Sequence, residues 1–297
     1  MWKMHFEGKM NFKKKTTCNI LELKKHIVDE IQNIEVPLLH YPLLEETGIV
    51  DHCFSTRMGG VSRGIYESMN FSFVRGDDPE AVMENYRRVA RAMGSEIECF
   101  VTTDQTHTVN VRKVTVEDAG KGVTRPRDYT DVDGLITNEP GLILSTFYAD
   151  CVPLYFVDPV NKAIGLSHSG WRGTVSRMGK VTLEAMREAY GTNPADVYAA
   201  VGPSICQDCY EISEEVAERF YLEFPEHGEE ILINKGNGKY QLDLWKNNEM
   251  ILLEAGILPE HLAVTNICTC CNEKLLFSHR ASRGQRGNLG AFLMLRP

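Results

Sequence analysis

Three short apolar runs lie close together between residues 141 and 170, in the segments GLILSTFY, CVPLYFVDP and KAIGLSHSG. Apolar runs of this length, bounded by turn signals, are typical of buried β-strands. The DPVN segment between the second and third runs favours a hairpin turn. Asp150 and Cys151 stand where the first run meets the second, and His168 lies near the end of the third. The sequence thus predicts buried strands with an acid, a thiol and an imidazole at their ends.

Helical patterns are interspersed with strand-like runs along the chain. The clearest helix begins at Asp78 and Pro79, a cap and a favoured first helical residue, and ends at Gly94. Further helices are predicted over residues 178–190, 213–224 and 243–256. Strands are predicted in VPLLHYPLL, GIVDHCFSTR, CFVTTDQTH, DVYAAVG, LLFSHRASRG and LGAFLMLRP. This mixture of helices and strand hairpins predicts an α/β (α+β) fold, in which a mixed sheet has helices packed outside it.

The first 35 residues differ from the rest of the chain. In the segment NILELKKHIVDEIQN, Ile20, Leu23, Ile27 and Ile31 recur at helical spacing and predict a helix. No linker rich in Pro, Gly or Ser divides the residues that follow. We therefore expect a variable N-terminal extension over residues 1–35 and a single domain over residues 36–297.

Charge and cysteine content narrow the functional classes. The net charge is −9 and the pI is about 5.5, which argues against a nucleic-acid partner. No apolar stretch approaches the roughly 20 residues that span a bilayer, so we expect no membrane partner. The nine cysteines are odd in number and unevenly spaced, which favours a reducing compartment over a disulfide framework. A cytoplasmic protein is expected.

His107, Cys151 and His168 are the first candidate site. Two imidazoles and a thiolate form a suitable zinc shell, and three protein ligands leave the fourth position open, as catalysis requires. Their spacing matches no short metal motif, and a lone Cys or His in an apolar run is usually a core residue. A third interpretation makes Cys151 a nucleophile and His168 its base, with Asp150 or another carboxylate orienting the imidazole.

Two arginines and two cysteine clusters are further candidates. Arg57 and Arg172 lie in glycine turns, where they can clamp a phosphate or carboxylate or simply face solvent. The CQDC and CTCC segments can hold a structural zinc, but the C-x-C-C order of the second lacks the usual knuckle spacing, so free thiols are favoured. Neither a Walker A sequence nor a G-x-G-x-x-G turn is present, which gives no support to nucleotide cofactors.

Taken together, the motifs resemble the laccase-domain family of YfiH-like proteins, long labelled multicopper polyphenol oxidoreductases and now described as purine nucleoside phosphorylases. The resemblance runs in order from about residue 50 to the C-terminus. It rests on FSTRMGGVSRGIYESMNFSF, GDDPEAVMENYRRV, QTHTVNV, DVDGLIT, YADCVPLYFVDP, GLSHSGWRGTV, VGPSI with CYEI, and CTCCNEKLLFSHRASRGQRGNLGA. His279 departs from the family pattern, which has a tyrosine there.

The resemblance implies a layered α/β sandwich related to the catalytic domain of cytotoxic necrotizing factor toxins. It implies zinc held by His107, Cys151 and His168, and phosphorolysis of adenosine, inosine, guanosine and methylthioadenosine, with adenosine deamination as a second reaction. Arg57, Asn70 and Arg172 are expected to bind purine nucleoside and phosphate, and Asp150 is expected to move a proton beside Cys151. Arg57 and Arg172 are also expected to assist catalysis, in a monomer or small homo-oligomer.

Two other activities stay open at this point. The older family label implies copper-dependent phenol oxidation, but multicopper centres need many closely paired histidines, and the nine histidines here are scattered with no His-x-His. The related toxins use a Cys–His pair without metal, which keeps a hydrolase open. Some relatives are discussed as peptidoglycan-precursor editing enzymes, but no residue of this sequence indicates that role.

Overall fold

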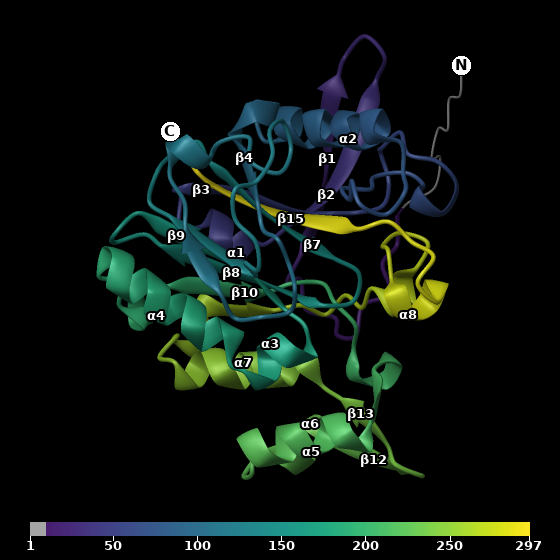
Figure 1. Cartoon of the computed structure of the whole chain (residues 1–297), viewed down its shortest axis with the longest axis vertical. Helices are drawn as coiled ribbons and strands as arrows, with labels where there is room; N and C mark the ends of the chain where they lie inside the picture. The colour runs from purple at the N-terminus through teal and green to yellow at the C-terminus, as the bar shows by residue number, and fades with distance from the viewer. Residues whose placement is uncertain (1–9) are drawn as a thin grey trace.

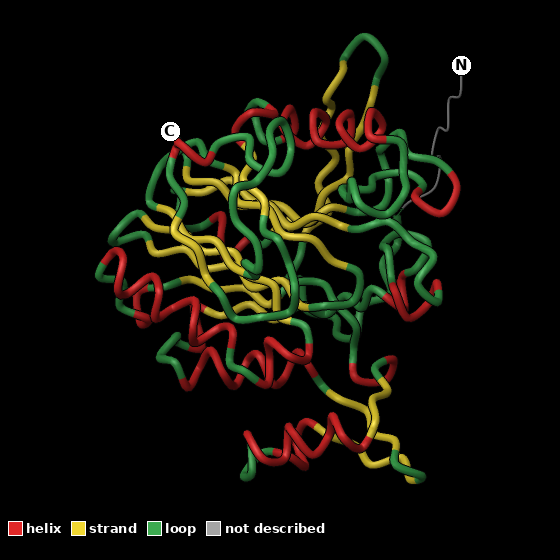
Figure 2. Tube along the Cα trace, in the orientation of Figure 1, coloured by secondary structure: helices red, strands yellow, loops and turns green. Residues whose placement is uncertain are grey.

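The computed structural model describes residues 10–297, which form a four-layered sandwich (Figure 1). Two six-stranded sheets stack face to face in the middle. Helix α2 (Pro79–Ala92) covers the outer face of the first sheet, and helices α4 (Met178–Tyr190) and α7 (Leu244–Glu254) cover the outer face of the second. The strands fill the centre of the molecule and most helices lie outside it (Figure 2). This arrangement confirms the predicted α/β class.

Both large sheets are mixed. The first is antiparallel except for the parallel pair β4–β7, and the second has two parallel pairs, β5–β6 and β10–β14. In spatial order the first sheet contains β1 (Glu22–Asp29), β2 (Ile34–His40), β3 (Val50–Ser55), β15 (Leu289–Leu295), β7 (Ile143–Tyr148) and β4 (Phe100–Thr102). The second contains β14 (Leu262–Val264), β10 (Tyr198–Val201), β8 (Val152–Asp158), β9 (Ala163–Ser169), β6 (Gly134–Thr137) and β5 (Val111–Lys113).

A smaller lobe projects from the sandwich below α7 (Figure 1). It contains a three-stranded sheet and two helices. The sheet consists of β11 (Glu211–Ser213), β13 (Lys239–Leu242) and β12 (Leu232–Gly236), and the helices are α5 (Glu214–Glu223) and α6 (Gly228–Ile231). The remaining short helices are α1 (Pro42–Glu45), α3 (Trp171–Val175) and α8 (His279–Ser282). Among the described residues, no helix is both long and apolar enough to span a membrane.

The sequence patterns explain the main elements. Asp78 caps α2 by accepting a hydrogen bond from the Glu80 N–H at 3.0 Å, as predicted. The predicted DPVN turn joins β8 to β9, and the Asp158 carboxylate accepts from the Val160 and Asn161 N–H groups within it. Between the sheets, aromatic and aliphatic side chains from both inner faces form one apolar core.

The predicted N-terminal helix is wrong. Residues 22–29 form strand β1, which pairs antiparallel with β2. Ile27 and Ile31, which carried the helical pattern, are 60% and 98% exposed. Pairing with β2 outweighs the weak helical period, because tertiary contacts override local propensity in short segments. Residues 1–9 of the predicted extension lie outside the described part of the chain.

The predicted strand at LLFSHRASRG is also wrong. The apolar residues of this segment are buried in a loop, and the chain then turns into α8. The Ser278 hydroxyl starts this helix by accepting a hydrogen bond from the Ala281 N–H at 3.1 Å, and Gly284 follows in the left-handed region at φ 88°. A serine cap and a glycine stop therefore decide the local structure.

A histidine pair in the first sheet makes folding stability depend on pH. His40 is buried, its Nε2 lies 3.0 Å from Nε2 of His26, and burial lowers the pKa of His40 to about 3. The unfolded chain binds a proton on this side chain as the pH falls through about 6.5, whereas the folded chain stays neutral until about pH 3. Stability is therefore full above pH 6.5 and is lost as the pH falls below it.

We expect His40 to lower the free energy of unfolding by about 1–2 kcal/mol between roughly pH 7 and pH 5. Urea unfolding of the wild type and of His40→Gln at both pH values measures this contribution. Because glutamine does not titrate, the variant should lose less stability than the wild type on acidification. An equal loss in both proteins would show that His40 does not carry the effect.

Candidate metal centre

Three side chains predicted from distant parts of the sequence converge on one point. His107, Cys151 and His168 each offer a ligand atom, and these atoms all lie within 4.8 Å of one another. The rings of His107 and His168 meet edge to face at 78°, with centroids 5.0 Å apart. His168 is buried and His107 is exposed, so the cluster is open to solvent on one side.

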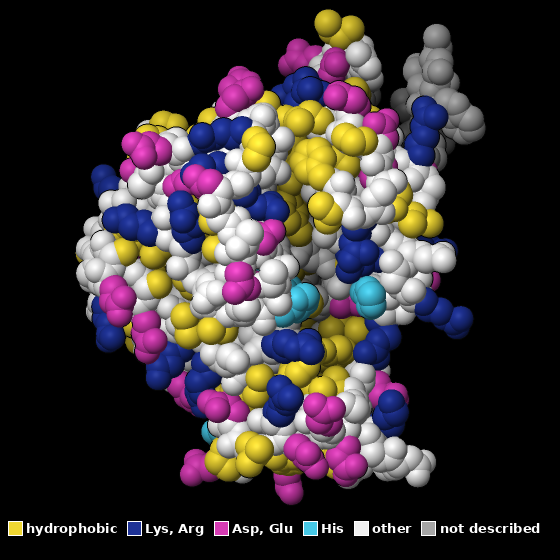
Figure 3. All heavy atoms as spheres, in the orientation of Figure 1, with side chains coloured by type: hydrophobic (Ala, Val, Ile, Leu, Met, Phe, Trp, Pro, Cys, Tyr) yellow, Lys and Arg dark blue, Asp and Glu magenta, His cyan; other side chains and the backbone are white. Residues whose placement is uncertain are grey.

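The topology of the second sheet brings these residues together. Cys151 precedes β8, whose first residue Val152 pairs with Ser169 at the end of β9, so the thiol lies beside His168. His107 lies in the loop between β4 and β5, in the left-handed region at φ 68°. Figure 3 shows that this face is hollowed between the sandwich and the smaller lobe, with histidine side chains at the hollow and Lys and Arg side chains around it.

A fourth residue, Asp133, holds two of the three cluster residues in position through hydrogen bonds. Its fully buried carboxylate accepts a hydrogen bond from Nδ1 of His168 at 2.7 Å. It also accepts from the backbone N–H groups of Thr106, His107 and Thr108 at 3.0–3.2 Å, and so holds the His107 loop. Burial opposes ionisation, but the hydrogen bonds from His168 and the loop outweigh it and lower the pKa of Asp133. An ionised Asp133 keeps the proton on Nδ1 and leaves Nε2 of His168 free as a ligand.

The neighbouring histidines favour the thiolate form of Cys151, which is the form that binds a cation. Burial alone would raise the pKa of the Cys151 thiol, but the imidazoles of His168 and His107 outweigh burial and lower it to about 6. Burial alone would lower the pKa of His168, but Cys151 and Asp133 raise it to about 9. In the metal-free protein the two groups thus form a thiolate–imidazolium pair at neutral pH, and a divalent ion, when bound, would take the place of the proton on Nε2 of His168.

The donor set and the space around it fit a metal ion. One thiolate and two imidazoles are ligands that zinc and other transition metals prefer, and the carboxylate behind His168 is the usual support for such a ligand. A side chain at Gly170 would place its Cβ 3.1 Å from both Sγ of Cys151 and Cδ2 of His107. The absence of a side chain there leaves these two ligands free to approach a common ion.

Asp150 lies next to the cluster in a constrained conformation. Its φ of 91° is rare for a residue with a side chain. One carboxylate oxygen accepts from the Thr269 hydroxyl at 2.7 Å and the other from the Arg280 N–H at 2.7 Å. Asp150 does not contact His168 as an orienting carboxylate, because Asp133 holds that position.

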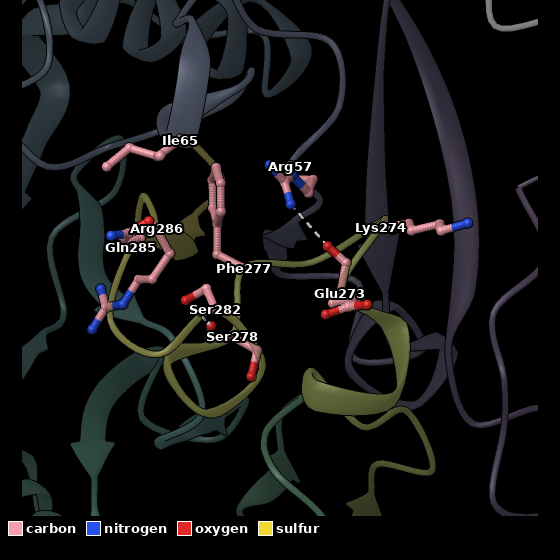
Figure 4. Close-up of a pocket in the computed structure, with 9 residues that line it drawn as sticks. All are labelled: Arg57, Ile65, Glu273, Lys274, Phe277, Ser278, Ser282, Gln285 and Arg286. Carbon is pink, nitrogen blue, oxygen red and sulfur yellow. Dashed lines mark hydrogen bonds between the residues drawn. The ribbon is translucent and has the colours of Figure 1, made fainter.

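A cavity of about 200 Å³ is lined by Arg57 and Arg286 among others, and by none of the three cluster residues (Figure 4). The guanidinium of Arg57 lies 4.6 Å from the ring centroid of Phe277 and donates to the carbonyl oxygens of Glu67 and Glu273. In Figure 4, Arg57 and Arg286 lie on opposite sides of the Phe277 ring. Among the described residues, the buried Nε of Arg286 has no hydrogen-bond partner. Two cations around an aromatic ring, one with an unused donor, suit an anionic or planar ligand.

The structure places the other predicted binding residues elsewhere. Arg172 is exposed at the start of α3, stacked 4.3 Å from the Trp171 ring, and does not line this cavity. Asn70 is fully buried, and its amide donates to Ser72 and Asp77 and accepts from the backbone of Ser72 and Asn288. These contacts make Asn70 a support for the loop that carries Arg286, and its contact with substrate stays a prediction.

Sequence reasoning missed Asp133 and Arg286. Both lie in segments that the resemblance includes, DVDGLIT and RGQRGNLGA, but nothing local marks either side chain. Asp133 lies opposite His168 because β6 pairs with β9. Arg286 lines the cavity because the long loop before β15 passes beside it. His279 sits in α8 beside this loop, and burial lowers its pKa, assisted by the charge of Arg286.

Comparisons with known proteins identify relatives of this chain. A family model described as multi-copper polyphenol oxidoreductase laccase matches residues 51–296. The chain is 36% identical over 244 residues to the purine nucleoside phosphorylase YlmD of Bacillus subtilis, covering 81% of this chain and 86% of that protein. It is 32% identical over 229 residues to the adenosine deaminase RL5 of an unknown prokaryotic organism, covering 76% and 87%. The crystal structure of the hypothetical protein YfiH of Bacillus licheniformis superposes with a TM-score of 0.83 at 32% identity, covering 87% and 96%.

Proposed function

Because this chain belongs to the multi-copper polyphenol oxidoreductase laccase family, we propose that it is a zinc-dependent purine nucleoside phosphorylase that also deaminates adenosine. The substrates proposed are adenosine, inosine, guanosine and methylthioadenosine, with phosphate as the acceptor. The convergence of His107, Cys151 and His168 carries this proposal. Relatives named for both activities support it.

Zinc is proposed over copper on the chemistry of the donors. One thiolate and two imidazoles with an open position match a catalytic zinc site. A multicopper centre needs many more histidines, and the nine in this chain include no His-x-His. When bound, zinc would supply a Lewis acid for the purine or a water of lowered pKa for deamination.

The residues of the chain supply the remaining parts of the reaction. Phosphorolysis separates a cationic sugar carbon from a purine that leaves with negative charge, so the site must hold phosphate against the sugar. Arg286 and Arg57 can bind this anion in the cavity, and Arg172, which lies outside the cavity lining, is proposed to assist from the exposed start of α3. Asp150, with both oxygens held by hydrogen bonds, is placed to accept and return a proton beside Cys151.

The direct test gives the purified protein inosine and phosphate. We expect hypoxanthine and ribose 1-phosphate in equal amounts, and no cleavage when phosphate is left out. Adenosine without phosphate should yield inosine and ammonia. A protein that carries its zinc but forms none of these products would overturn the proposal.

Arg286 provides a test of the anion site. Replacement by glutamine removes one charge-assisted contact, so we expect Arg286→Gln to raise the KM for phosphate roughly tenfold. Arg283→Gln is the matched control, because Arg283 is an exposed arginine in the same loop and should leave this KM unchanged. Equal KM values in Arg286→Gln and the wild type would remove Arg286 from the phosphate site.

One geometric observation favours a second candidate, a metal-free thiol hydrolase. Asp133, His168 and Cys151 stand in the order of a carboxylate, an imidazole and a nucleophile. Chelation separates the two candidates, because a zinc enzyme loses activity with its metal and regains it when zinc is returned. Full activity in the zinc-free protein, or cleavage of peptidoglycan precursors by it, would favour the thiol enzyme.

A further inference from the structure

A second cysteine cluster lies apart from the metal centre described above. The sulfur atoms of Cys206, Cys209, Cys268 and Cys271 all lie within 4.8 Å of one another. Sγ of Cys209 and Sγ of Cys271 are 3.6 Å apart, and all four thiols are free. Four sulfurs bonded tetrahedrally at about 2.3 Å from one zinc ion stand about 3.8 Å apart. The cluster therefore already has the dimensions of a four-sulfur metal site.

The structure corrects the interpretation of CTCC as lacking knuckle spacing. The cluster uses Cys268 and Cys271, which form a C-x-x-C pair, and leaves Cys270 out. Each member of this pair lies 62 residues after its counterpart in the first pair, Cys206 or Cys209. Both pairs end in short 3₁₀ turns, at residues 207–209 and 270–272. Two C-x-x-C turns facing each other are the usual frame of a structural zinc site.

The surroundings of the cluster suit bound thiolates. Sγ of Cys268 accepts from the backbone N–H groups of Cys206 at 3.3 Å and Cys271 at 3.4 Å, the kind of support that metal-bound sulfur receives. Lys15 forms an ion pair at 2.7 Å with Asp208, which lies between the first two cysteines. The ammonium group of Lys15 is therefore near the cluster and offsets part of its negative charge.

We propose that Cys206, Cys209, Cys268 and Cys271 bind a second, structural zinc ion. Four thiolates leave no open coordination position, so this ion does not take part in nucleoside chemistry. The proposal does not depend on the function proposed above. Zinc suits it best because tetrahedral sulfur ligands select zinc or iron–sulfur centres, and no additional ligand is needed here.

The second zinc would connect the two cysteine turns to Asp150. Thr269, between two cysteines of the second segment, donates its hydroxyl to Asp150. The Ile205 N–H, next to Cys206, donates to the backbone oxygen of Asp150 at 3.0 Å, and the Arg280 guanidinium donates to the Cys209 carbonyl at 3.0 Å. A metal that joins the turns would hold these partners of Asp150 in place.

Metal analysis of the full chain, purified without metal added afterwards, tests the proposal. We expect about two zinc ions per chain in the wild type, one for each cluster. The double variant Cys209→Ser/Cys271→Ser should retain about one zinc ion, the one held by His107, Cys151 and His168. Cys151→Ala should also retain about one zinc ion, the one held by the four cysteines. Cys270→Ser is the matched control and should keep both, because Cys270 lies in the same segment but outside the cluster. Equal zinc content in the double variant and the wild type would overturn the proposal.

Two measurements avoid the need for the double variant to fold. X-ray absorption of zinc in Cys151→Ala should show only sulfur neighbours, at about 2.3 Å. In the wild type, alkylation followed by peptide mass spectrometry should label these four cysteines only after chelation, whereas exposed Cys18 should react at once. Nitrogen or oxygen neighbours around the zinc, iron in its place, or a disulfide among the four cysteines would each contradict the proposal.

Discussion

Replacing Cys151 with alanine should remove the catalytic metal and lower kcat/KM for inosine phosphorolysis by about 10³-fold or more. The sulfur is the anionic member of the trio, because its pKa of about 6 makes it a thiolate at neutral pH. Without it, two imidazoles remain, which hold a divalent ion poorly. Steady-state assays and zinc analysis on the same preparation measure both losses together.

Cys270→Ala is the control for this experiment. Cys270 is a half-buried thiol that belongs neither to the His107–Cys151–His168 trio nor to the four-cysteine group, so its loss should leave phosphorolysis unchanged. Turnover by Cys151→Ala at the wild-type rate would show that the reaction does not pass through this cluster. A loss of activity without any loss of zinc would instead favour the thiol as the reacting group.

Asp133→Asn should weaken zinc binding about 100-fold although Asp133 does not touch the ion. Asparagine keeps one acceptor oxygen but replaces the other with an amide NH₂, which cannot accept from the backbone N–H groups or from His168. The imidazole then loses its fixed tautomer and the His107 loop loses its anchor. Competition with a chromophoric chelator measures the affinity.

Addition of excess zinc distinguishes a positioning residue from a metal ligand. It should restore part of the activity of Asp133→Asn, whereas it should not restore the activity of Cys151→Ala. Asp128→Asn is the control, because Asp128 is exposed five residues away and its carboxylate accepts from Lys121 and not from the His107 loop. An unchanged zinc affinity in Asp133→Asn would mean that the carboxylate does not support the metal.

Local patterns predicted the parts of the site that depend on local structure. The DPVN turn fixed the β8–β9 hairpin, and that hairpin alone sets Cys151 beside His168. His107 was found from its residue type and its place near a strand end. Asp133 was not, because its role arises from the pairing of Gly134 with Ser167 across the sheet. Strand pairing between distant segments leaves no mark on a single sequence.

The wrong predictions have the same origin. Residues 22–29 show a helical period, but their neighbour β2 makes them a strand. The second C-x-x-C pair was hidden by Cys270 between its members, and only the approach of the two turns separates the four grouped cysteines from Cys270. In each case the partner is distant in the chain.

The central claim is that His107, Cys151 and His168 share one zinc ion. An anomalous difference map, recorded at the zinc absorption edge from crystals of protein purified without added metal, tests this most directly. The account predicts a peak about 2.0–2.3 Å from a ring nitrogen of His107, from Sγ of Cys151 and from Nε2 of His168. A map with no peak among these atoms, or a metal that one of the three does not reach, would contradict it.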